Sequence, residues 1–125
     1  MKIDTKPLAI EKSSMEIEGS WSQVDQADEI MIAMYSIDAD DNMVKSLQAE
    51  RDAMKKSMNF LKDLFGLSAK QVDKIYKHVS SQTLNLYISY VCGLIKGGKV
   101  ESFADFEKEV KESQHPKEQS EKSDE

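Results

Sequence analysis

The stretch Phe60–Val72, FLKDLFGLSAKQV, contains the end of one predicted helix and the start of the next. Its apolar residues before the break have helical spacing: Phe60, Leu61, Leu64 and Phe65. Gly66 follows directly, and glycine ends helices because it adopts the left-handed backbone conformation at little cost. Ser68 and Gln71 have the spacing of a capping box, in which each side chain bonds the backbone amide of the other residue. The stretch therefore predicts a corner between two helices, with Leu67 packed inward.

Helical patterns extend on both sides of this corner. Apolar residues recur at steps of three and four over 22–35, 42–65, 69–79, 82–96 and about 103–110. The segment 82–96 is the most apolar and is expected to form the centre of the core. The expected helix caps are Ser22 with Asp25, then Asp40 or Asp41, then Ser68, and finally Ser102. Trp21 is expected to pack on the first turn as a hydrophobic staple.

Residues 2–18 have a different pattern, which predicts a β-hairpin. Its first half is compatible with a strand, although Pro7 would restrict that strand to an edge. Met15 and Ile17 alternate with glutamates, as in a half-buried strand. A lone hairpin is marginal in water, so we expect it to pack on the helices or to pair with another copy.

These patterns predict a mainly α fold. We expect a small bundle of about five helices with an N-terminal hairpin, in a single domain over residues 1–112 with its helices in 22–112. The remaining segment, 113–125, has no apolar residue, and we expect it to be a disordered acidic tail.

Charge is unevenly distributed along the 125 residues. Residues 1–50 contain 4 basic and 11 acidic side chains, 51–99 contain 9 and 3, and 100–125 contain 4 and 9. A basic middle between acidic ends can pair within one fold or head to tail between copies.

Few residues suit catalysis or metal binding. His78 lies at a helix end, His115 lies in the tail, and no nucleophile motif, metal-ligand spacing or phosphate loop appears. Cys92 is surrounded by apolar residues and is expected to be a buried, inert thiol. We therefore expect a non-enzymatic protein with no catalytic residues, no metal and no cofactor. No segment has the length of a membrane span or a signal peptide, so we expect a cytoplasmic protein without membrane association.

The long helix has one apolar stripe with a seven-residue repeat. Leu47, Met54 and Leu61 form one series, and Arg51, Met58 and Phe65 form the other. An arginine in so short a stripe is more typical of an ordinary bundle helix than of a coiled-coil seam.

The order of elements resembles a known family. The hairpin around LAIEKSSMEIEG, the helix end FLKDLFGL and the helix LYISYV before glycine are similar to the small tail assembly chaperones of long-tailed bacteriophages and prophages of Gram-positive bacteria. The resemblance covers roughly residues 2–110. It implies a chaperone that coats the tape-measure protein and keeps it soluble until tail-tube subunits polymerise around it, with the tail-tube protein as a second candidate partner.

Two sets of residues are expected to mediate contacts. The seven methionines provide adaptable packing, and the surface predicted to bind the partner centres on the helix corner: Met54, Met58, Phe60, Phe65 and Leu67. The hairpin is predicted to mediate self-association into rings or spirals through an open edge: Leu8, Ile10, Met15 and Ile17.

A regulatory module that binds DNA through the basic region 51–79 is the alternative. Lys70, Lys74 and Lys77 would contact phosphates there. The same helix has no cluster of residues for reading base edges, and the flanking acidic segments would repel phosphate, so nucleic acid is the less favoured partner.

Overall fold

The helix corner at Gly66 is present in the computed structural model, which describes residues 1–36, 42–99 and 102–114. Helix α2 (Met43–Phe65) ends at Gly66, whose φ of 63° lies in the left-handed region. Helix α3 (Ala69–His78) begins after Ser68, whose hydroxyl accepts from the Gln71 amide at 3.1 Å. The Gln71 side chain accepts from the Ser68 amide at 2.9 Å. The predicted cap, the predicted stop and the inward packing of Leu67 are all confirmed.

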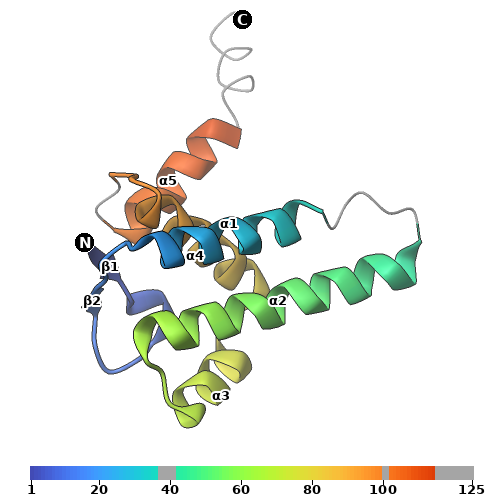
Figure 1. The fold of residues 1–125 in the computed structure, drawn as a ribbon, viewed down its shortest axis with the longest axis horizontal. Coiled ribbons are helices and arrows are strands. Elements are labelled where there is room, and N and C mark those ends of the chain that lie inside the picture. The colour runs from blue at the N-terminus through green and yellow to red at the C-terminus, as the bar shows by residue number, and fades with distance from the viewer. Residues whose placement is uncertain (37–41, 100–101, 115–125) are drawn as a thin grey trace, which may run out of the picture.

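The described residues form a mainly α fold, as predicted. The other helices are α1 (Trp21–Tyr35), α4 (Ser81–Ile95) and α5 (Phe103–Gln114). Helix α1 packs against both α2 and α4, and α4 also contacts α5. In Figure 1, α1 lies along α2, α3 lies near the C-terminal end of α2, and α5 projects from the bundle. Helix α5 continues to Gln114, two residues beyond the expected end of the helical domain at 112. The rest of the expected tail, 115–125, lies outside the described residues.

Two helix starts differ from the predicted ones. Ser20, not Ser22, caps α1, because the Gln23 side chain reaches back to the amides of both Ser20 and Gly19, at 3.1 and 2.8 Å. Trp21 is therefore the first helical residue and is 86% exposed, so it is not a staple.

Asn42 caps α2 by accepting from the amides of Val44 and Lys45. Asp40 and Asp41, which were expected in that role, lie outside the described residues. The cap at Ser102 is confirmed, since its hydroxyl accepts from the Asp105 amide at 3.2 Å.

The hairpin is present but has short strands. Strands β1 (Lys2–Asp4) and β2 (Ser14–Glu16) are antiparallel, with Ile3 opposite Met15. Between them the chain forms a single turn of 3-10 helix, η1 (Lys6–Leu8), because Pro7 has no amide for a strand ladder and suits a helix start. The predicted strand pattern of residues 5–10 is therefore wrong.

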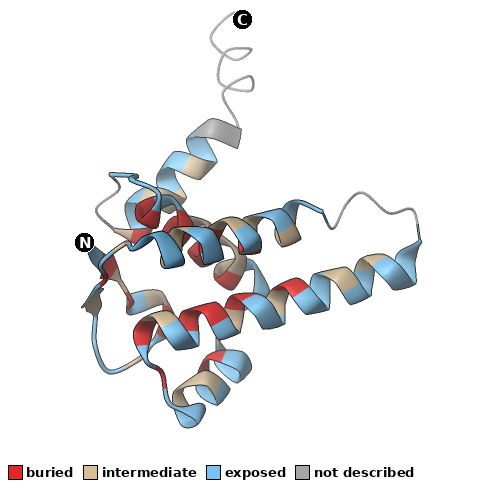
Figure 2. Ribbon diagram, viewed as in Figure 1, coloured by how far each residue is buried: buried red, intermediate tan, exposed pale blue. Residues whose placement is uncertain are grey.

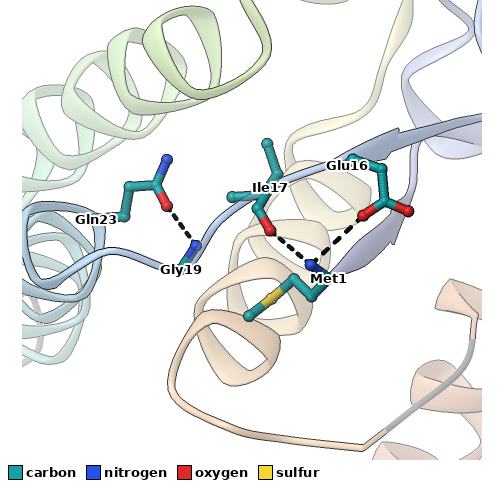
Figure 3. Close-up of polar contacts among 5 residues, drawn as sticks. All are labelled: Met1, Glu16, Ile17, Gly19 and Gln23. Carbon is teal, nitrogen blue, oxygen red and sulfur yellow. Dashed lines mark hydrogen bonds and ion pairs between the residues drawn. The ribbon is translucent and has the colours of Figure 1, made fainter.

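The two ends of the hairpin meet at Met1. Its α-amino group donates to the Ile17 carbonyl at 2.6 Å and lies 3.5 Å from a carboxylate oxygen of Glu16, as Figure 3 shows. The same view shows the Gln23 side chain bonded to the Gly19 amide where the hairpin leads into α1. The hairpin is thus closed at its base and joined directly to the first helix.

Asp4 anchors the hairpin to the helices. Its amide donates to the Tyr90 hydroxyl at 3.0 Å, and its carbonyl accepts from the Tyr87 hydroxyl at 2.6 Å. Its carboxylate accepts from the amides of Lys6 and Phe103, both at 3.0 Å. Burial, with smaller contributions from Tyr90 and Asp4, raises the pKa of the Tyr87 hydroxyl well above its ordinary value. One residue therefore joins β1, α4 and the first residue of α5.

Helix α4 forms the centre of the core, as predicted. Eight of its 15 residues are buried, including Tyr87, Ile88, Val91 and Leu94. Tyr87 and Tyr90 extend the core into an aromatic cluster with Phe103 and Phe106, with ring centroids 5.6–6.4 Å apart. Figure 2 shows that the buried residues of α2 gather toward its C-terminal half, which leaves the other half mostly exposed.

Candidate partner-binding groove

A groove of about 730 Å³ lies between α2, α3 and the start of α4. Its apolar lining comes from all three elements: Leu47, Met54 and Met58 of α2, then Val72, Ile75, Tyr76 and Val79 of α3 and its cap, and Leu84 of α4. Leu47 is 58% exposed and Tyr76 is 79% exposed. Exposed apolar side chains gathered in one concave surface mark an interaction site more often than scattered ones do.

The groove exists because the stripe on α2 is only partly covered. No residue in 43–52 is buried, whereas Ala53, Ser57, Phe60, Leu61 and Phe65 are buried. The apolar stripe is therefore exposed at Leu47 and becomes part of the core near Phe60. Its exposed and half-buried part, Leu47, Met54 and Met58, is called the seam below. Met54 and Met58 lie at the transition and are half-buried. Their flexible thioether chains can fill gaps of differing shape, so the groove has an adaptable floor.

Helix α3 forms a thin outer wall. Its only buried residue is Ile75, and it is bounded by the Gly66 corner and by the break at Val79–Ser80. Its Lys77 pairs with Asp73 at 3.1 Å on the outside. Few packing contacts hold such an element, and elements of this kind adjust most readily when a partner binds.

The predicted partner-binding residues fall into two groups. Met54 and Met58 line the groove, and for them the role stays a prediction. Phe60, Phe65 and Leu67 are at most 6% exposed and belong to the hydrophobic core. These three residues therefore contribute to the core of the fold and do not line the groove.

The predicted self-association residues are also largely covered. Leu8 and Ile17 are buried, while Ile10 and Met15 are partly buried against the core. The outer edge of β1 is occupied at Asp4 by the two tyrosine hydroxyls of α4. In this register the N–H and C=O groups of Ser14 and Glu16 point away from β1. Another strand could therefore extend the sheet only along this outer edge of β2.

The described residues, 1–36, 42–99 and 102–114, were expected to bind no metal. No group of three or more metal-ligating side chains gathers in that part of the chain. Cys92 is buried, and burial raises the pKa of its thiol to about 11, so it is inert as predicted. Among the helices that the structure describes, none combines the length and apolarity needed to cross a bilayer.

The described part of the chain is a small helical domain with a hairpin closed at its base and an exposed apolar groove. The sequence profile of the phage tail assembly chaperone proteins matches residues 1–114, and the chain belongs to this family. Membership of a chaperone family points to a non-enzymatic role. Neither a curated protein nor a solved structure matches the chain.

Sequence reasoning missed most of the groove. Leu47 and Arg51 belong to the stripe predicted for a bundle helix. The helical spacing over 69–79 predicts that Tyr76 is buried, whereas its side chain is 79% exposed. Arg51 could have predicted the exposed part of the groove, because a cation within an apolar stripe indicates that this part of the stripe faces water. The role of Asp4 had no local signal, since its partners are 83–99 residues away in sequence.

Proposed function

We propose that this chain binds the tape-measure protein of its phage and keeps it soluble until tail-tube subunits assemble around it. The observation that carries the proposal is the exposed apolar groove beside α2, in a chain that belongs to the tail assembly chaperone family. A long helical protein with an uncovered apolar seam aggregates unless that seam is shielded. The groove provides such a shield.

The nature of the lining supports a reversible interaction. Met54 and Met58 can repack against different side chains, which favours binding many related segments over one tight fit. Several copies along one tape-measure chain would then act together, and each could be displaced when the tube forms. This function requires no metal, nucleotide or acid–base pair.

The proposal extends to assembly and location. Copies of the chain would associate as a ring or spiral around the tape-measure protein, guided by the acidic ends and the basic middle of the sequence. The tail-tube protein would be the second partner, at the stage of displacement. The site of action would be the cytoplasm of a Gram-positive host, as the resemblance implies.

Co-expression with the tape-measure protein of the same phage tests the function. Wild-type chain is expected to move the tape-measure protein into the soluble fraction. Leu47→Lys and Met54→Lys are expected to reduce that fraction, because each places a charge in the apolar lining. Ile32→Lys is the matched control, since Ile32 is 67% exposed on α1 and does not line the groove.

Circular dichroism of each variant separates loss of binding from loss of folding. Leu47 is exposed, so Leu47→Lys is expected to leave the helical signal unchanged. Insoluble tape-measure protein in the presence of folded wild-type chain would refute the proposed function. Full solubility with both groove variants would place the binding surface elsewhere.

A further inference from the structure

The outer rim of the groove on α2 is basic. Arg51 and Lys55 line the groove one turn apart, and both are exposed. At 100° per residue they lie beside the seam of Leu47, Met54 and Met58, on the side away from the buried Ala53 and Ser57. Within the described chain, neither cation has an ion-pair partner.

Two acidic residues of α2 lie near this rim: Glu50 lines the groove, and Asp52 is exposed outside the lining. Lys62 continues the same ridge of α2 toward the helix end and is exposed. On the opposite wall, Lys77 and Asp73 pair with each other. Glu50 lies across the seam from Arg51 and Lys55, toward the core side of α2. The open mouth of the groove along α2 is therefore positive, although the whole chain has a net charge of −6.

We propose that the occupant of the groove is an amphipathic helix of the partner, with carboxylates on the flank that faces Arg51 and Lys55. This inference rests on the proposed function, because the helix would belong to the tape-measure protein. The seam from Leu47 to Met58 covers 11 residue steps, or about 16 Å at 1.5 Å per residue. A partner helix of about three turns fills that length with apolar residues at i, i+4, i+7 and i+11.

The two rim cations, Arg51 and Lys55, would give the groove a preference among partner helices whose apolar residues fit it equally well. An exposed ion pair changes affinity only a few-fold, but a helix with lysines on the same flank would meet repulsion instead of attraction. Two rim cations therefore predict a preference of about tenfold for the acidic flank at low salt. The preference should shrink at 1 M salt, where the Debye length is about 3 Å.

Two synthetic peptides test this assignment by fluorescence anisotropy. Both are labelled with fluorescein, have about 14 residues and share one leucine seam, and they differ only in glutamate or lysine on the flanks. Wild-type chain is expected to bind the glutamate peptide more tightly, against the sign of its own net charge. The variant R51E/K55E is expected to reverse the preference. The control K45E/K70E makes the same change in net charge on α2 and α3, outside the groove lining, and is expected to leave the preference intact.

The outcomes separate this inference from the proposed function. Equal affinity for both peptides, binding of neither peptide, or a preference that survives R51E/K55E overturns the acidic-helix assignment. If the tape-measure protein is still kept soluble in that case, the chaperone function stands without it. If the peptides are discriminated as expected but the tape-measure protein stays insoluble, the groove assignment stands and the proposed function falls.

Discussion

The variant Asp4→Asn tests whether one carboxylate holds the hairpin on the helical bundle. The substitution preserves the size of the side chain and leaves the backbone groups that bond Tyr87 and Tyr90 in place. It changes only the two carboxylate contacts, to the amides of Lys6 and Phe103. An asparagine can present its oxygen to one of these donors, and its NH₂ group then faces the other. One hydrogen bond is lost, and so is the negative charge at the start of α5.

The expected cost follows from these two losses. A hydrogen bond to a charged group contributes about 1.5–3 kcal/mol, and an anion at a helix N-terminus contributes about 0.3–1 kcal/mol. The two contributions overlap, and Asp4 is only half-buried, so we expect a decrease of about 2 kcal/mol in the free energy of unfolding. For a chain of this size, that corresponds to a decrease of roughly 8 °C in melting temperature.

Urea denaturation followed by circular dichroism measures this change. Glu18→Gln is the matched control, because it removes an exposed carboxylate from the same segment and should change stability by less than about 0.5 kcal/mol. A change for Asp4→Asn that is no larger than the control would refute the anchoring role of Asp4.

Two further predictions concern the core. Leu94 is 7% exposed, so Leu94→Ala should cost about 2–5 kcal/mol by urea denaturation, and an unchanged midpoint would show that this face of α4 is not packed. Burial raises the pKa of both Cys92, from 9.0 to about 11, and Tyr87, from 10.0, so the folded state holds these protons more tightly than the unfolded state. The free energy of unfolding should therefore keep its full value below about pH 9. It should fall as the pH rises above about 9, where the unfolded-state thiol of Cys92 loses its proton, and further above about 10, where the unfolded-state hydroxyl of Tyr87 does. Each group can lower it by at most about 1.4 kcal/mol per pH unit. Melting temperatures measured from pH 7 to 11 test this pH dependence. The variant Tyr87→Phe should lose less stability above pH 10 than the wild type. A wild-type melting temperature that stays constant to pH 11 would contradict the prediction.

The elements that sequence reasoning predicted correctly are those with local signals. Gly66 and the Ser68–Gln71 pair act within a few residues of chain, so their effect can be predicted from spacing alone. Competition between local signals is harder to resolve. Ser20 and Ser22 both precede a suitable capping partner, and the choice depends on which backbone amides the Gln23 side chain reaches.

The candidate site was predicted less well because it depends on which part of an apolar stripe the tertiary structure covers. Phe60 and Met54 belong to the same helix and the same kind of pattern, yet one is buried in the core and the other lines the groove. Periodicity shows that a stripe exists, but the packing of α1, α3 and α4 decides where it becomes surface. The same limit applies to Asp4, whose role is defined by residues 87, 90 and 103.

Site-specific photo-crosslinking can show whether the groove itself contacts the tape-measure protein. A photoreactive phenylalanine analogue at Leu47 or Tyr76 is expected to crosslink to the co-expressed tape-measure protein, because both side chains are exposed at the groove. The same analogue at Ile32, which is exposed on α1, is expected to give little or no crosslink. Crosslinks from Ile32 but not from Leu47 or Tyr76, with the tape-measure protein still soluble, would show that the groove is not the contact surface.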